Sequence, residues 1–218
     1  MKGLIVAALI LLCVLGYSER VRAQEEVRVR SVDLYISGFG GYSFPFSTDL
    51  KFGGLTAPDV KLEDSLSVGG KIGMWLTAPR KTWGIDVGFE IDVTHFNPDI
   101  SNSTLELDAT YFGLNVLARL PMGVTPDLPN GRWFPYIGIG GGGQRLAMKA
   151  PGTNEGRNTA PAFQGLGGIK VFLNKYFAVF AEGKFIYASH NQKLEGASIP
   201  LELDLSSVHG VGGLSFHF

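Results

Sequence analysis

The chain after residue 31 is dominated by an alternation of apolar and polar positions. The clearest run is 83–94, WGIDVGFEIDVT, where every odd position is Trp, Ile, Val or Phe and every even position is Gly, Asp, Glu or Thr. Successive side chains of a strand point to opposite faces of a sheet, so this period predicts strands with one apolar face and one polar or small face. The other runs with this pattern are 32–43, 66–76, 105–120, 133–148, 162–173, 177–188 and 201–218.

These runs are too long for an ordinary soluble sheet. They span about 11 to 18 residues, whereas a strand of a globular protein usually has about 5 or 6 and a tilted strand crosses a bilayer in about 9–11. A sheet in lipid must close on itself, because an open edge would leave N–H and C=O groups unpaired. The sequence therefore predicts an all-β fold, an eight-stranded antiparallel up-and-down transmembrane β-barrel.

The connections between the predicted strands alternate in length. The second and sixth, 77–82 and 174–176, are short, as periplasmic turns are in outer-membrane barrels, whose outer loops are longer. The fourth, 121–132, is longer than this rule expects. With the N-terminus on the periplasmic side, the extracellular loops are predicted at 44–65, 97–104, 149–161 and 189–200.

The apolar face changes parity inside two of the predicted strands. Leu105 and Leu107 occupy odd positions of the fourth run, whereas Leu114 and Val116 occupy even ones. The same Leu-Glu-Leu-Asp tetrapeptide opens the eighth run, at 201–204. An extra residue in a strand produces such a switch, so a β-bulge near the outer rim is predicted.

The first 23 residues have the organisation of a secretory signal peptide. Lys2 precedes an apolar run over 4–15, and Ala23 provides a small residue before the cleavage site. The apolar run is shorter than the about 20 residues of a membrane-spanning helix, which favours cleavage over an uncleaved anchor. The predicted organisation is a signal peptide at 1–23, an N-terminal periplasmic segment at 24–31 and the β-barrel at 32–218.

Composition and charge exclude several functions. With 19 Lys+Arg against 20 Asp+Glu, the formal net charge is −1, which argues against a nucleic-acid partner. Hydrophobic residues make up 45% of the chain and aromatic residues 11%, too many for intrinsic disorder. Cys13 is the single cysteine and lies in the predicted signal peptide, so neither a disulfide framework nor a cysteine-based zinc site is expected. No cofactor and no metal site is predicted.

The end of the chain, GGLSFHF, places aromatic residues at its third-last and last positions after a glycine: Gly213, Phe216 and Phe218. Glycine-rich aromatic runs recur at 35–42 (YISGFGGY), 134–140 (FPYIGIG) and 180–185 (FAEGKF). With these features the chain resembles the eight-stranded outer-membrane β-barrel superfamily that includes the OmpA transmembrane domain and OmpX. The resemblance covers essentially all of residues 30–218.

The resemblance implies a monomer in the outer membrane of a Gram-negative-type bacterium, in contact with outer-membrane lipid and lipopolysaccharide. Gly213, Phe216 and Phe218 would then form the C-terminal signal that the outer-membrane barrel assembly machinery reads. An extracellular ligand, which the sequence does not identify, would meet the outer loops.

Assigning the apolar face to lipid places a set of charged residues inside the barrel. An eight-stranded barrel is just wide enough for its own side chains to fill, and buried charges need partners. We therefore expect the four basic and four acidic members to pair with one another. They are Lys71, Asp86, Glu90, Asp92, Arg119, Lys170, Glu182 and Lys184.

The two short turns predict which of these charges meet. If Leu76 lies opposite Trp83, Lys71 is diagonal to Asp86 and Glu90, within reach of long side chains. If Leu173 lies opposite Phe177, Lys170 lies opposite Phe180 and diagonal to Glu182.

Four functions remain open at this point. The first is a filled, ion-paired barrel with a structural or surface-interaction role through loops 44–65, 149–161 and 189–200. The second is a narrow channel or a carrier for small molecules. The third is a lipid-modifying enzyme using Ser189 and His190, but their order does not match that of the known deacylases, so no catalytic residue is assigned. The fourth is a soluble lipocalin-type barrel, which would need its apolar face inward.

Overall fold

The computed structural model describes residues 31–218 except 53–54, 101–105, 129, 150–155 and 194–199. The predicted signal peptide at 1–23 and almost all of the segment 24–31 lie outside the described residues. No helix among the described residues is long and apolar enough to cross a membrane.

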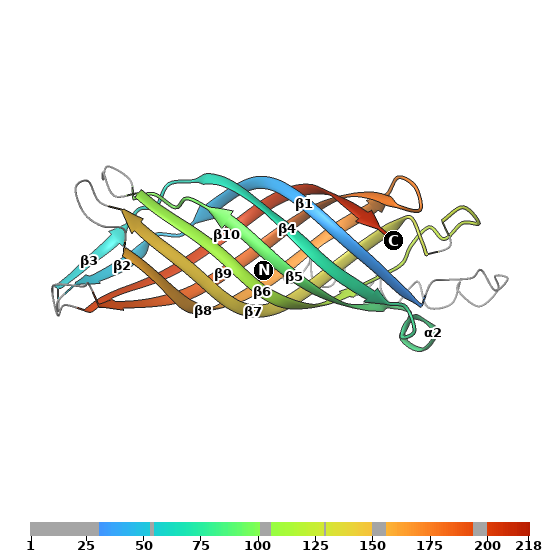
Figure 1. The fold of residues 1–218 in the computed structure, drawn as a ribbon, viewed down its shortest axis with the longest axis horizontal. Helices are drawn as coiled ribbons and strands as arrows, with labels where there is room; N and C mark the ends of the chain where they lie inside the picture. The colour runs from blue at the N-terminus through green and yellow to red at the C-terminus, as the bar shows by residue number, and fades with distance from the viewer. Residues whose placement is uncertain (1–30, 53–54, 101–105, 129, 150–155, 194–199) are drawn as a thin grey trace, which may run out of the picture.

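Eight long strands form one closed barrel, whose arrangement is seen in Figure 1. Each is antiparallel to its neighbour in sequence, and the last pairs with the first, with Phe39 opposite Gly213, so the barrel has no open seam. The predicted fold class is confirmed. The strands are β1 (Val32–Pro45), β4 (Ser65–Leu76), β5 (Asp86–Phe96), β6 (Glu106–Arg119), β7 (Trp133–Lys149), β8 (Gly156–Phe172), β9 (Phe177–Lys193) and β10 (Pro200–His217).

Two further strands extend the sheet beyond one end of the barrel. β2 (Thr48–Phe52) and β3 (Leu55–Val60) form a hairpin inside the segment expected to be a long loop. β2 pairs with the start of β10, where Leu50 lies opposite Leu203, and the hairpin lies at the left of Figure 1. The sequence did not reveal this hairpin because 48–60 (TDLKFGGLTAPDV) lacks a sustained alternation and contains a proline.

One of the two registers deduced from the turns is wrong. The chain after β4 forms a short helix, α2 (Arg80–Trp83), which ends at Gly84 with a φ of 73°, the left-handed region that favours glycine. β5 therefore begins at Asp86, Leu76 lies opposite Val87, and Lys71 lies opposite Asp92. At the other turn the expectation is confirmed, because the Leu173 N–H donates to the Phe177 carbonyl at 2.8 Å and Lys170 lies opposite Phe180.

The outer face of the barrel is apolar and the inner face is largely polar. Large apolar side chains such as Ile137 and Leu114 point outward and are 69% and 66% exposed. On β7 this outward series runs from Trp133 to Gly143 and is followed by Arg145. That span of 11 residues matches the about 9–11 that a tilted strand needs to cross a bilayer.

The predicted β-bulge is absent from β6 and from β10. The β6–β7 register runs without a shift from Glu106 to Arg119, and the β9–β10 register is equally regular. The leucines taken to face lipid, such as Leu107, instead point into the barrel. They form an apolar layer at the end of the barrel opposite α2 with Phe96, Ala109, Leu146, Leu203 and Leu205, all at most 3% exposed.

Candidate functional site: the charged interior of the barrel

All eight charged residues assigned to the interior are buried there. None is more than 5% exposed. Five of the eight strands contribute at least one of them, each at a position whose side chain points into the barrel. The set is Lys71 on β4, Asp86, Glu90 and Asp92 on β5, Arg119 on β6, Lys170 on β8, and Glu182 and Lys184 on β9.

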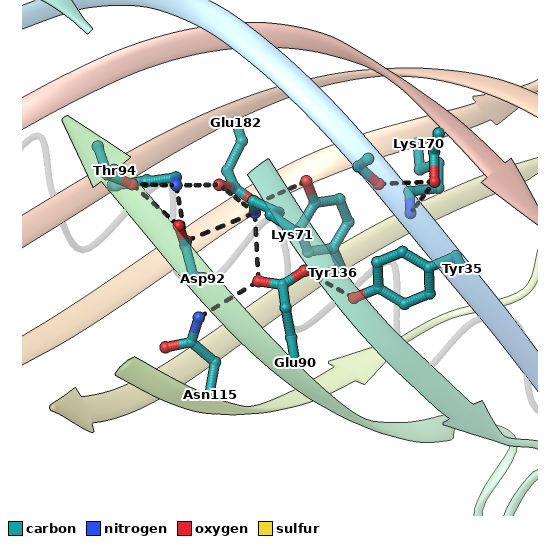
Figure 2. Close-up of polar contacts among 12 residues, drawn as sticks. Tyr35, Lys71, Glu90, Asp92, Thr94, Asn115, Tyr136, Lys170 and Glu182 are labelled. Atoms are coloured by element: carbon teal, nitrogen blue, oxygen red, sulfur yellow. Dashed lines mark hydrogen bonds and ion pairs between the residues drawn. The ribbon is translucent and has the colours of Figure 1, made fainter. Parts of the chain in front are cut away.

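Lys71 lies at the centre of three carboxylates in the middle of the barrel (Figure 2). Its Nζ donates to both oxygens of Glu182 at 2.7 Å, lies 3.3 Å from Glu90 Oε1 and 4.0 Å from Asp92 Oδ2. The carboxylates come from β5 and β9, on opposite sides of β4. One ammonium therefore joins strands that do not pair with one another.

Lys184 is the second cation of the same network. Its Nζ donates to Asp92 Oδ2 at 2.7 Å and to Thr94 Oγ1 at 3.0 Å, and lies 3.7 Å from Glu182 Oε1. Two lysines thus share three carboxylates. Because the carboxylates outnumber the lysines by one, the network also needs neutral hydrogen-bond donors.

Neutral donors complete the network. The Tyr35 hydroxyl donates to Glu90 Oε2 at 2.6 Å, and the Asn115 amide donates to Glu90 Oε1 at 3.2 Å. The Tyr136 hydroxyl donates to Glu182 Oε2 at 2.8 Å. Period-two reading places these residues on the inner face but does not show which carboxylate each contacts, and sequence reasoning did not single them out.

A second cluster lies at the end of the barrel next to α2. Arg119 contacts Asp86 at 2.8 Å and Asp33 at 3.0 Å, and its guanidinium lies between the Trp75 and Phe134 rings, 4.4 and 4.3 Å from their centroids. Sequence reasoning missed Asp33, although its place between Val32 and Leu34 put it on the inner face. Arg80, which contacts Asp86 at 2.6 Å, lies in the turn and carries no periodic signal.

Lys170 has a different environment from the other interior cations. Among the described residues no carboxylate lies within 4.0 Å of its Nζ, so the predicted contact with Glu182 does not form, because Glu182 binds Lys71 and Tyr136 instead. The Lys170 Nζ donates to Ser215 Oγ at 3.1 Å and lies 4.1 Å from the centroid of the Tyr35 ring.

Ser215 continues this contact into a hydrogen-bonded series. Its Oγ lies 3.0 Å from His217 Nε2, and His217 Nδ1 lies 2.7 Å from Asp33 Oδ1. The order resembles a Ser-His-Asp triad, but all three residues are at most 2% exposed. The neighbouring cavity, lined by Tyr35 and Lys170 among others, measures ≈ 10 Å³, about the space of one water molecule. An acyl substrate does not fit beside this serine.

Ser189 and His190 do not form a nucleophile–base pair. They are consecutive on β9, so their side chains lie on opposite faces: Ser189 is exposed, whereas His190 is buried with its Nε2 3.1 Å from Gln144 Oε1. His209 contacts Ser67 and Ser207. Within the described part of the chain no group of three or more His, Cys, Asp or Glu side chains is arranged to hold a metal ion.

The terminal aromatic residues lie outside the barrel. Phe216 and Phe218 are 40% and 52% exposed, with ring centroids 6.1 Å apart, and Tyr176 stacks on Phe216 at 6.3 Å. Gly213 belongs to the inner face, where an added Cβ would lie 2.6 Å from the Phe180 ring. The backbone carbonyl of Gly38 would lie still closer to that Cβ, so the backbone and the ring together leave room only for glycine.

A closed eight-stranded barrel with an apolar outer face and a charged, filled interior defines the class of transmembrane β-barrels. No protein-family model matches the chain, and no curated protein matches its sequence. The crystal structure of Neisserial surface protein A (NspA) is similar, with a TM-score of 0.56 and 11% identity over 85% of this chain and 97% of that one. The outer membrane protein OprG from Pseudomonas aeruginosa gives 0.54 and 15% over 86% and 96%. At such identities the likeness shows the fold alone.

Proposed function

We propose that this chain is an outer-membrane protein whose barrel is a closed support and whose extracellular end carries out surface interactions. The observation that carries the proposal is the set of contacts of Lys71. Its 2.7 Å contact with Glu182 and 3.3 Å contact with Glu90 join β4, β5 and β9 across the lumen. A solute would have to break these contacts to pass.

The apolar layer at the outer end supports the same function. Phe96, Leu107, Leu146 and Leu205 are fully or almost fully buried inside the barrel, beyond the charged network. Water and ions that entered from that end would first meet hydrocarbon side chains. The proposal therefore favours a filled barrel over a narrow channel or a carrier.

The extension at the outer end is the part available to partners. β7 to β10 have 17 or 18 residues, against 11 and 12 for β5 and β4, and the β2–β3 hairpin adds to their sheet. In this proposal that surface meets the extracellular ligand, the outer band contacts lipid, and the exposed Phe216 and Phe218 are read by the assembly machinery. The protein acts as a monomer and not as an enzyme.

Three experiments test the proposal. Cell fractionation should recover the protein with the outer membrane, and unboiled samples should migrate faster than boiled samples in detergent gels, as a closed barrel does. The folded protein in planar bilayers should show no conductance steps. Steps that disappear in Lys71→Met would overturn the filled barrel in favour of the narrow channel, and recovery in a soluble fraction would overturn the location.

A further inference from the structure

The outward apolar band of the barrel ends in a row of polar side chains on four adjacent strands. His95 of β5 lies opposite Thr110 of β6, Thr110 opposite Arg145 of β7, and Arg145 opposite Thr159 of β8. On each of these strands, the next outward-facing position toward the middle of the apolar band carries an apolar side chain or is a glycine. These positions are Val93, Phe112, Gly143 and Pro161.

Arg145 is exposed in this row and has no partner within the described residues. It forms no hydrogen bond or ion pair there, although Asp108 is diagonal to it. The Asp108 carboxylate instead lies 3.5 Å from His95 Nδ1. Arg157 is exposed and lies opposite Ala147, diagonal to Arg145 on the neighbouring strand, a separation that long side chains span. Two guanidinium groups therefore share the outward face at the border of the apolar band.

Two glycines of β7 lie on the outward face between Arg145 and the middle of the apolar band. Gly143 is covered by the Phe112 ring, whose Cζ would lie 2.7 Å from an added Cβ. Gly141 is open on its outward side, with the nearest atom to an added Cβ at 3.6 Å. It lies between Leu114, 66% exposed, and Phe163, 49% exposed. An apolar track thus leads from the bilayer core up to Arg145.

We propose that Arg145 and Arg157 bind the phosphate group of an outer-leaflet lipid, with an acyl chain of that lipid lying along the track over Gly141. A guanidinium forms paired charge-assisted hydrogen bonds with phosphate oxygens, and the Thr110 and Thr159 hydroxyls flank the same place. A headgroup phosphate lies where the apolar band ends, which is the height of this row. The inference rests on the proposed function in one respect only, namely that this end of the barrel faces the outer leaflet.

The test uses the full folded chain in an uncharged maltoside detergent, with lipid A as the probe and retained lipid measured by native mass spectrometry. Arg145→Gln should weaken lipid A binding at least about tenfold, as loss of a charge-assisted contact does. Asp108→Asn should strengthen it, because it removes the neighbouring negative charge. Arg132→Gln is the matched control, since Arg132 is exposed just before β7 at the opposite end of the barrel, and should bind as the parent does.

Other outcomes overturn the proposal. Unchanged lipid A binding in Arg145→Gln would exclude the arginine as the phosphate ligand. Equal retention of dephosphorylated lipid A would reduce the contact to acyl packing, and competition by millimolar inorganic phosphate alone would indicate a site for free phosphate. None of these results depends on fractionation, so a protein found outside the outer membrane would refute the location and leave the binding result interpretable.

Discussion

Lys71 of β4 and Glu182 of β9 meet inside the barrel at 2.7 Å although β1 and β10 separate their strands in the sheet. The contact therefore crosses the lumen and joins two strands that are not neighbours in the sheet. Lys71 is 5% exposed and Glu182 is 4% exposed, so neither charge has bulk water as an alternative partner.

This relationship predicts strong coupling between the two residues. Lys71→Met and Glu182→Gln should each lower the free energy of unfolding by ~3–5 kcal/mol, because each removes the closest partner of a buried charge. The double variant should be much less destabilised than the sum of the two. Urea unfolding of the barrel in lipid vesicles measures all three. Additive losses would mean that water already solvates both groups, which would favour the channel.

The assignment of faces predicts how charge is tolerated on the outside of the barrel. Phe89 is 46% exposed on the outer face, in one row with Met74 and Val116 in the middle of the apolar band. Phe89→Arg should cost ~2–4 kcal/mol at that depth. Leu173→Arg, in the turn between β8 and β9, should cost ~0–1 kcal/mol because it lies near the interface. The same vesicle assay compares them, and similar losses would contradict the position of the band.

Glycines on the two faces should respond differently to a methyl group. On the inner face, an added Cβ at Gly88 would lie 2.7 Å from the Trp75 ring, whereas on the outer face Gly165 has nothing within 4 Å. Gly88→Ala should therefore cost ~1–3 kcal/mol through overpacking, and Gly165→Ala should be close to neutral. The unfolding free energies of the two variants decide it, and an equal effect would show that the Trp75 ring adapts.

Period-two reading predicted the eight barrel strands and the burial of the eight charges that it assigned to the interior, because alternation is a local property of each strand. It did not predict which charges meet, since that depends on register and on contacts across the lumen. The Lys71 register failed because α2 and Gly84 lengthen the turn, whereas the alternation of 83–94 already begins at Trp83 and makes the end of the turn look like strand. The prediction of a bulge was wrong because the sequence does not distinguish an inward leucine such as Leu107 from a lipid-facing one. Sequence periodicity distinguishes two faces but does not say that the inner face becomes apolar at one end.

Lys170 should behave unlike Lys71 when its charge is removed. It is 5% exposed, as Lys71 is, but among the described residues it faces Ser215 and the Tyr35 ring and no carboxylate within 4.0 Å. Lys170→Met therefore removes a buried charge without leaving an unpaired acid, and it nearly conserves volume. Volume-conserving changes between apolar residues cost less than ~1.5 kcal/mol in well-packed cores. Because no acid loses a direct partner, we expect a loss of that order for Lys170→Met, against the ~3–5 kcal/mol expected for Lys71→Met. Urea unfolding of both variants in the same vesicles makes the comparison. A loss for Lys170→Met as large as that for Lys71→Met would show that Lys170 balances the charges of the network over longer distances than direct contact.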